Sequence, residues 1–315
     1  SFLLNIQPGD EIILPSYTFV STANAFVLNG AKPVFVDIRR DTLNINENLI
    51  EPLITKKTKA IIPVHYAGVS CEMDKIVEIA NKNNLLIIED NAHGLFGKYK
   101  NKFLGTFGTF STQSFHETKN ITCGEGGALF INDAKYIKRA EIIFDKGTNR
   151  LDFLKKQVNK YSWIDIGSSY RLSDLLAAFL FGQLENSKKI QNKRKKIWKK
   201  YYSLLEKWAL INNVLLPFIP SHCESSYHMF YLIMPNRKSR DKLINWLNKN
   251  KINSVFHYIP LHKSTMSKKF GWDRSKCPIT IEISERIIRL PMFYNLKMKK
   301  IEYIVEKILM YQKFT

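Results

Sequence analysis

The stretch from Ser111 to Gly127, STQSFHETKNITCGEGG, combines residue types that can carry out covalent chemistry. Lys119 follows a short strand pattern containing aromatic residues and precedes a cluster of three glycines, Gly124, Gly126 and Gly127. A lysine attacks a carbonyl group only when its amine has lost its proton and is held rigidly, which a buried position at the end of a strand can provide. The glycines allow a tight turn and a close approach of the backbone to a flat ligand. The alternative is an ordinary lysine among the 48 basic residues of the chain.

An acidic strand end lies upstream of this lysine. Residues 85–88 form an apolar run of strand length, and the carboxylates of Glu89 and Asp90 begin where that run ends. Ligands of open α/β sheets bind outside the carboxyl ends of the strands, so we expect Asp90 and His93 beside a ligand. Pyridoxal phosphate needs such a set of residues, because a lysine forms the imine and a carboxylate keeps the pyridine nitrogen protonated.

The elements that would position these residues follow an alternating pattern in residues 1–144. Short apolar strands alternate with helices, which predicts parallel β-α units and a sheet covered on both faces. We expect strands at 11–14, 34–37, 59–64, 85–88, 109–115 and 128–131, and helices at 17–28, 47–54, 72–82 and from a cap at Asp133 to 144.

The remainder of the chain divides into a long irregular segment, two helices and a smaller unit. Residues 146–171 are predicted to form a loop that binds substrate or crosses a dimer interface. Helices are expected at 172–185, 187–208, 239–250, 281–289 and 298–311, and strands at 229–234 and 254–258. We therefore predict a large cofactor-binding domain over 1–208 and a small α+β domain over 209–315.

Several phrases in one order make the sequence similar to the DegT family of sugar-nucleotide aminotransferases, from about Gly9 to the C-terminus. The phrases are PSYTFVST at 15–22, PVHYAG at 63–68, SFHETK at 114–119, KGTNR at 146–150, DIGSSY at 165–170 and HYIPLH at 257–262. The resemblance implies the aspartate aminotransferase-like fold, which is fold type I of the pyridoxal phosphate enzymes, with a large, mostly parallel mixed sheet.

The resemblance also implies roles for single residues. It makes Lys119 the covalent anchor of pyridoxal 5'-phosphate and Asp90 the partner of its ring nitrogen. It places His93 at the ring hydroxyl, Ser114 at the phosphate and Phe19 stacked on the ring. Without the resemblance, Phe19 would be a core aromatic residue and Ser114 would face solvent. The same comparison suggests substrate contacts from the loop and from the C-terminal part, namely Arg150, Tyr161, His257 and Tyr258.

Within the family, the sequence most resembles the dTDP-4-amino-4,6-dideoxygalactose transaminases. The expected reaction is ping-pong transfer of an amino group from glutamate to the C4 ketone of dTDP-4-keto-6-deoxyglucose, with the axial, galacto product. This product would serve cell-surface polysaccharide synthesis, and the enzyme would be a homodimer. Sugar dehydratases of the same family carry histidine in place of the lysine, so Lys119 disfavours that activity.

Composition excludes several classes of protein. A chain of 315 residues with 45% hydrophobic residues can bury a full core, and it has neither an apolar run of membrane-spanning length nor a signal-peptide core. We therefore expect no membrane span and a cytoplasmic location. The four cysteines lack the paired spacing of a metal site, so we expect no metal and free thiols. Cys123, beside the glycines, is either a small apolar filler or a reactive thiol.

The net charge of +20 lies almost entirely in residues 151–315. Such asymmetry can indicate nucleic-acid binding, but no recognisable module interleaves aromatic residues with lysines, and we expect no nucleic-acid partner. Helical spacing of Ile190, Arg194 and Ile197 instead predicts that the surrounding lysines cover a solvated helix face. A further alternative is an impaired fragment with a structural role, because the chain lacks an opening segment that cradles the cofactor phosphate in relatives.

Overall fold

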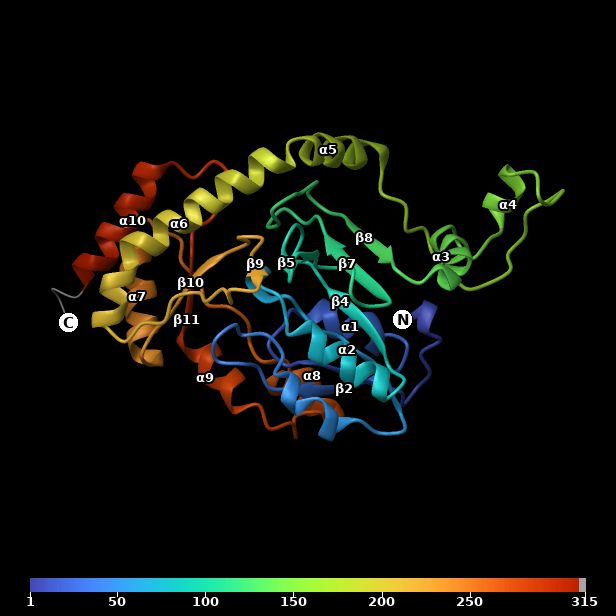
Figure 1. Cartoon of the computed structure of the whole chain (residues 1–315), viewed down its shortest axis with the longest axis horizontal. Helices are drawn as coiled ribbons and strands as arrows, with labels where there is room; N and C mark the ends of the chain where they lie inside the picture. Colours follow the sequence, from blue (N-terminus) through green and yellow to red (C-terminus); the bar gives the residue numbers. More distant parts are fainter. Residues whose placement is uncertain (312–315) are drawn as a thin grey trace.

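The computed structural model describes residues 1–311 and has a six-stranded sheet as its centre (Figure 1). The strand order is β2-β1-β3-β4-β7-β8, and every neighbouring pair is parallel except the antiparallel pair β7 and β8. The six strands are β1 (Glu11–Pro15), β2 (Lys32–Val36), β3 (Thr58–Ile61), β4 (Leu86–Asp90), β7 (Phe110–Ser114) and β8 (Gly127–Ile131). This mostly parallel, mixed sheet matches the predicted architecture.

Both faces of the sheet are covered because successive side chains of a strand point to opposite sides. Ile13 and Ile87 pack with residues of helix α2 (Met73–Lys82) in one cluster. Ile12 and Ile88 pack in a second cluster with residues of helix α1 (Val20–Val27). The apolar runs in the sequence are therefore central strands, as their composition predicts.

Two predicted helices in this region differ from the observed structure. Helix α1 begins at Val20 rather than at Tyr17, because Tyr17 lies in a bend after β1, where its hydroxyl donates a hydrogen bond to the carbonyl of His257. The predicted helix at 47–54 is instead two short 3-10 turns, Glu47–Leu49 and Glu51–Leu53. Pro52 at the start of the second turn cannot donate the backbone hydrogen bond that a continuous helix needs.

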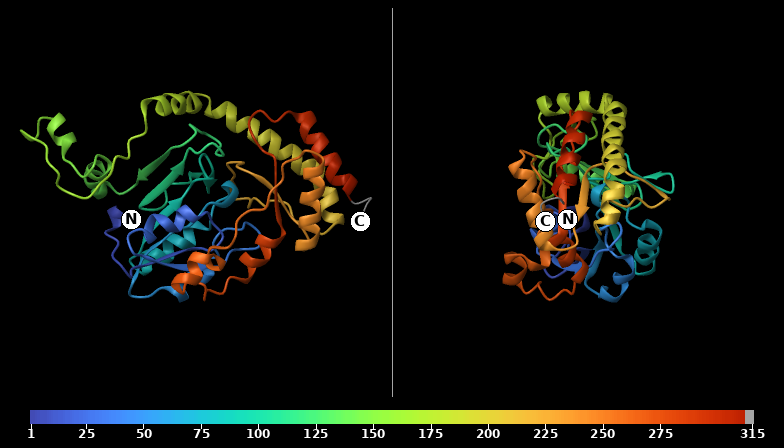
Figure 2. Two further views of the ribbon diagram at one scale, coloured as in Figure 1. Left: turned by 180° about the vertical axis from the view of Figure 1, so that it is seen from behind. Right: turned by 90° about the vertical axis from the view of Figure 1, so that its left-hand side faces the viewer.

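An arm and two long helices follow the sheet. The arm comprises residues 146–171 and contains one short helix, α4 (Arg150–Leu154), beyond α3 (Ile137–Phe144). In Figures 1 and 2 the arm extends away from the body of the molecule. The next two helices, α5 (Asp174–Glu185) and α6 (Ser187–Ile211), run along the upper side of that body in the same views. A small three-stranded sheet beside the main one joins β5 (Lys98–Tyr99), β6 (Lys102–Phe103) and β9 (Cys223–Glu224).

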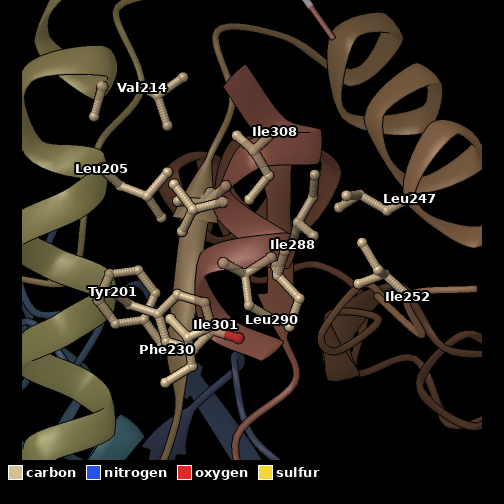
Figure 3. Close-up of a cluster of buried hydrophobic side chains, with 14 of the residues drawn as sticks. Tyr201, Leu205, Val214, Phe230, Leu247, Ile252, Ile288, Leu290, Ile301 and Ile308 are labelled. Carbon is tan, nitrogen blue, oxygen red and sulfur yellow. The ribbon is translucent and has the colours of Figure 1, made fainter. Parts of the chain in front are cut away.

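The C-terminal part packs helices around a two-stranded antiparallel sheet. Its strands are β10 (Phe230–Ile233) and β11 (Ile287–Leu290), and its helices are α7 (Arg237–Lys249), α8 (Thr265–Phe270), α9 (Pro278–Arg286) and α10 (Met298–Tyr311). Its core also contains residues of α6, including Tyr201 and Leu205 (Figure 3). The large and small domains predicted at 1–208 and 209–315 stay a prediction, and residues 312–315 lie outside the described residues.

Two elements of the C-terminal part differ from the prediction. The expected strand at 254–258 is absent, and only a single bridge joins Val255 to Arg289. The expected helix at 281–289 ends at Arg286, and the chain continues as strand β11. The adjacent β-branched residues Ile287 and Ile288 favour the strand, and both are fully buried against β10.

Candidate active site

Asp90 is the last residue of β4, at the carboxyl end of a central parallel strand. Its Oδ2 accepts a hydrogen bond of 2.7 Å from the hydroxyl of Thr22, and its Oδ1 accepts one of 3.1 Å from the backbone N–H of Ala92. The Thr22 hydroxyl is in turn 2.8 Å from that of Thr18. The carboxylate is therefore held in one orientation at the edge of the sheet where ligands of parallel sheets bind.

The segment behind Asp90 is held by a buried acid. Glu89 is fully buried, and its Oε2 lies 2.9 Å from Nε2 of His65. Backbone N–H groups of Gly105, Phe107 and Gly108 donate to the same carboxylate at 2.7–2.8 Å. These partners anchor the end of β4, so that Asp90 is presented by a rigid segment.

Lys119 lies in the loop between β7 and β8, which returns close to its starting point. The N–H of Phe115 donates to Gly126 O, and the N–H of Cys123 donates to Phe115 O. Two glycines are required by this turn. Gly124 has φ +90°, and a Cβ on Gly127 would lie 2.8 Å from the carbonyl oxygen of Gln113.

The Lys119 amine is strongly perturbed. Burial lowers the pKa of Lys119 to about 8, the charge of Asp90 opposes this shift and the charge of Arg289 adds to it. Within residues 1–311, Nζ of Lys119 has no hydrogen-bond or ion-pair partner. A substantial fraction of the amine is therefore neutral near physiological pH, which a nucleophilic lysine requires.

Three buried histidines surround this region. The rings of His93 and His228 stack with centroids 4.1 Å apart, and His257 lies 6.4 Å from His93. Burial lowers the pKa of each of the three, and the nearby cations Lys119 and Arg289 lower it further. All three imidazoles are therefore neutral near physiological pH.

The histidines differ in their partners. His228 Nδ1 lies 3.0 Å from Asn120 Oδ1, and His257 Nδ1 lies 2.8 Å from the hydroxyl of Tyr66. His93 Nδ1 is buried without a hydrogen-bond partner in the part of the chain that the structure describes. An unpartnered buried nitrogen of this kind can bond a ligand.

The remaining predicted cofactor residues lie close to these groups. Phe19 is 56% exposed, and its ring lies 6.2 Å from that of Tyr258, which in turn contacts His257 at 3.5 Å. Ser114 ends strand β7 and lines a cleft of about 290 Å³ together with Asp90 and Thr22. The structure thus brings Asp90, Ser114, Lys119 and the two aromatic residues to one edge of the sheet.

Lys119 faces a second, larger cavity of about 830 Å³, whose walls come from the loop after β7, from α5 and α6, and from β11 and the residues after it. Arg289 lines this cavity with Lys119. Arg289 and His228 were not among the predicted site residues. Arg289 was expected on a helix, whereas the β-branched pair before it was the available signal for a strand.

Arg150 and Tyr161 are not brought to Lys119 within one chain. Both lie in the arm, and neither lines the two cavities. Arg150 donates to the carboxylate of Asp145 at 3.5 Å, and the ring of Tyr161 lies 5.7 Å from that of Phe153. Their predicted contact with substrate stays a prediction.

Other classes of site can be compared with the described residues. No group of three or more His, Cys, Asp or Glu side chains within residues 1–311 is arranged to hold a metal ion. No helix in that range is long and apolar enough to cross a membrane. All four cysteines are free and buried, which confirms the prediction of free thiols and makes Cys123 a filler of its cluster.

Comparison with known proteins identifies the family. The model of the DegT/DnrJ/EryC1/StrS aminotransferase family matches residues 2–309. The chain belongs to this family. The spore coat polysaccharide biosynthesis protein SpsC of Bacillus subtilis is 30% identical over 96% of this chain and 79% of that protein.

Solved structures agree with this assignment. Spr1654 of Streptococcus pneumoniae, assigned as a sugar aminotransferase, matches in its PLP form with a TM-score of 0.89 and 27% identity, over 99% of this chain and 83% of that one. PseC of Helicobacter pylori, an aminotransferase involved in pseudoaminic acid biosynthesis, matches with a TM-score of 0.88 and 26% identity, over 99% and 84%.

The protein is accordingly a pyridoxal phosphate-dependent sugar aminotransferase of fold type I. The residues present fit this cofactor. An amine of lowered pKa at Lys119, an oriented carboxylate at Asp90 and an unpartnered nitrogen at His93 are the groups that a pyridinium ring with a carbonyl and a hydroxyl would need.

Proposed function

We propose that this aminotransferase transfers an amino group from glutamate to the C4 ketone of a nucleotide-linked 4-keto-6-deoxyhexose. The specific reaction proposed converts dTDP-4-keto-6-deoxyglucose to dTDP-4-amino-4,6-dideoxygalactose for cell-surface polysaccharide. Its main support is the position of Lys119, whose amine has a lowered pKa and faces a cavity of about 830 Å³. Such a volume lies within the range of pockets that enclose ligands of this size. The roles of SpsC in spore coat polysaccharide biosynthesis and of PseC in pseudoaminic acid biosynthesis agree with this proposal.

In this proposal each residue has a physical task. Lys119 would hold the cofactor covalently, and its amine would take a proton from the α-carbon of the donor and deliver one to C4 of the sugar. Asp90 keeps its negative charge beside the ring nitrogen. Bound there, the cofactor supplies an electron sink for the carbanion that proton removal leaves. Because its pKa is about 8, Lys119 can both accept and donate a proton near neutral pH.

The neighbouring side chains position the cofactor and the sugar. His93, held by its stacking on His228, bonds the ring hydroxyl through an uncharged imidazole. Phe19 covers the ring, and Ser114 bonds the phosphate. His257 and Tyr258, which line neither of the two cavities, would contact the sugar beside Phe19, whose ring lies 6.2 Å from that of Tyr258.

A second copy of this chain completes the proposed assembly. Helix α5 has no buried residue although most of its side chains are apolar, and Trp163 of the arm is 79% exposed. Exposed apolar surface of this extent marks an interaction site. The proposed homodimer would cover α5 and the arm, and it would carry Arg150 and Tyr161 of one copy toward the other copy's substrate.

Product analysis tests this function. The purified enzyme with pyridoxal phosphate, L-glutamate and dTDP-4-keto-6-deoxyglucose should yield 2-oxoglutarate and an equimolar dTDP-amino sugar. NMR coupling constants should report an axial amine at C4. An equatorial amine would correct the product, and transfer only to a ketone at another carbon would overturn the proposed substrate.

A further inference from the structure

Helix α6 concentrates positive charge that the proposed mechanism does not use. Its 25 residues include eight lysines, and Glu206 is its single acidic residue. Lys200 pairs with Glu302 of α10 at 2.8 Å, and within residues 1–311 the other seven lysines of the helix make no ion pair. The helix therefore presents a positive field to solvent rather than a network of paired charges.

The opposite side of α6 fixes this charge to the body of the molecule. Ile197 and Tyr201 are fully buried in the C-terminal core. The guanidinium of Arg194, on the same side, is buried and donates to the carbonyls of Tyr227 and His228. The lysines therefore project from a helix whose position is fixed, and Figure 1 shows that helix running along the upper side of the molecule.

Two exposed apolar residues continue the row of lysines at the end of the helix. Leu210 is 82% exposed and Ile211 is 70% exposed. They follow Lys199 and Lys200 by eleven residues, which is about three helical turns, so each lies on the same side of the helix as its lysine. Ala209, directly before them, is buried in the C-terminal core, which holds the end of the helix in place. One exposed face thus combines cations with aliphatic side chains.

This combination distinguishes between the anionic partners that could bind the face. A nucleic acid would pair its phosphates with the lysines but would give Leu210 and Ile211 no apolar surface to contact. A bilayer with anionic lipids matches both kinds of side chain, because its headgroups attract lysines and the acyl boundary beneath them accepts aliphatic groups. At about 1.5 Å per residue, the face extends about 35 Å from Lys188 to Ile211, which suits a flat surface.

We propose that the lysine face of α6, which comprises the lysines of this helix together with Leu210 and Ile211, binds the surface of a bilayer that contains anionic lipids. The helix lies on the bilayer rather than across it, since no helix within residues 1–311 is long and apolar enough to cross a membrane. The lysines supply the attraction to the headgroups, and the two aliphatic residues insert below them. This binding goes beyond the proposed reaction and does not depend on its substrate.

Sedimentation of the holoenzyme with vesicles tests the lysines. The enzyme should bind phosphatidylcholine vesicles that contain about one third phosphatidylglycerol at least about 100-fold more tightly than vesicles of phosphatidylcholine alone. About 1 M salt, which shortens the screening length to about 3 Å, should remove this preference. Replacing Lys195, Lys196, Lys199 and Lys200 together with glutamine should weaken binding to the anionic vesicles at least about 100-fold.

A matched control removes four lysines from another side of the molecule. Lys263, Lys268, Lys269 and Lys276 are exposed and lie in and around α8, at the lower side in Figure 1. Replacing them with glutamine changes the net charge by the same amount. This variant should bind anionic vesicles within about threefold of the wild type, because its charges lie further than a screening length from the bilayer. Equal losses in the two quadruple variants would overturn the proposed face, since net charge alone would then explain the binding.

The aliphatic end of the face is tested without a change of charge. The double variant Leu210→Ser and Ile211→Ser should bind anionic vesicles about 10-fold more weakly than the wild type, because it loses the apolar contact. Duplex DNA is the second probe. Binding of DNA that is tighter than binding of vesicles and unchanged in the serine variant would overturn the proposal in favour of a nucleic acid. A wild type that does not distinguish anionic from neutral vesicles would also overturn it. Sedimentation does not require turnover, so these outcomes are decided even if the proposed sugar substrate is wrong.

Discussion

The sheet that carries Asp90 at its edge and the region of the arm and helix α5 differ in how far their apolar residues are exposed. Every residue of β1 is buried, and both faces of the sheet are covered within one chain. In α5, by contrast, Leu175 is 85% exposed and Phe179 is 58% exposed. The apolar residues of the sheet are buried within one chain. The apolar residues of α5 resemble those of a protein core in type, but no described part of the chain covers them. This difference separates residues that one chain can place from residues that a second copy would place in the proposed homodimer.

The strongest test of the sheet edge is Lys119→Ala. The variant should lose turnover by at least about four orders of magnitude, because it lacks both the covalent anchor and the proton carrier. Borohydride treatment of the holoenzyme, followed by mass spectrometry, should label the wild type on Lys119 and leave the variant unlabelled. A cofactor adduct that forms on another lysine with turnover retained would contradict the assignment.

Asp90→Asn tests the other half of the same edge. Turnover should fall by about three orders of magnitude, because an amide cannot keep the ring nitrogen protonated. Circular dichroism and thermal unfolding should stay close to those of the wild type, since the amide oxygen can accept from the N–H of Ala92 while the amide NH2 donates to the Thr22 hydroxyl. Near-normal turnover would show that the strand-end acid has another role.

The pKa of Lys119 can be measured directly in the apoprotein. Its reaction with trinitrobenzenesulfonate, followed by mass spectrometry, should rise with pH with a midpoint near about 8, because burial favours the neutral amine. The reaction of Nα-acetyl-lysine in the same solution should have its midpoint at about pH 10.4. The reactivity of Lys119 rises through about pH 8 because its amine is mostly protonated below that pH and mostly neutral above it. A midpoint equal to that of the reference would contradict the buried environment.

The arm and α5 can be tested by adding charge to their exposed apolar face. The double variant Leu175→Glu and Phe179→Glu should weaken self-association by at least about 100-fold, because two charges would be buried in the proposed dimer. Analytical ultracentrifugation measures this change. Leu210→Glu alters an equally exposed leucine at the end of α6 and serves as the control. A wild-type chain that is monomeric at micromolar concentration would refute the dimer.

The smallest expected effect concerns Arg150 of the arm. Arg150→Ala should raise the KM for the nucleotide sugar about 10-fold, because it removes a charged contact to the diphosphate. Replacing Lys195, Lys196, Lys199 and Lys200 together with glutamine should leave KM within about twofold. The opposite pattern, with salt-sensitive binding of nucleic acid, would overturn this explanation of the positive charge.

The local pattern of apolar and polar residues was sufficient to predict most of the helices and strands. The alternation of apolar runs and helices predicted the main sheet, and the acid and the lysine were expected at its edge, where they lie. Helix α10 has the predicted bounds, Met298–Tyr311. The family and the cofactor followed from motifs around Lys119, and the family comparison confirms both.

Properties set by distant contacts were not predictable in the same way. A helix was predicted at Arg289 because its strand forms by pairing with β10, where its partner Tyr231 lies 58 residues earlier in the chain. His228 gave no local sign that it stacks on His93. The non-helical bend at Tyr17 likewise depends on a hydrogen bond to His257. In each case the deciding partner lies far away in the sequence.

Helix α6 spans 25 residues and belongs to two cores at once. Ile190 packs with Phe115 and Cys123 beside the Lys119 loop, whereas Trp208 and Ala209 pack in the C-terminal core. A cut between residues 208 and 209 would therefore divide a core rather than free a domain. We expect scanning calorimetry to show one cooperative transition for the whole chain, and separately expressed halves to be recovered as aggregates.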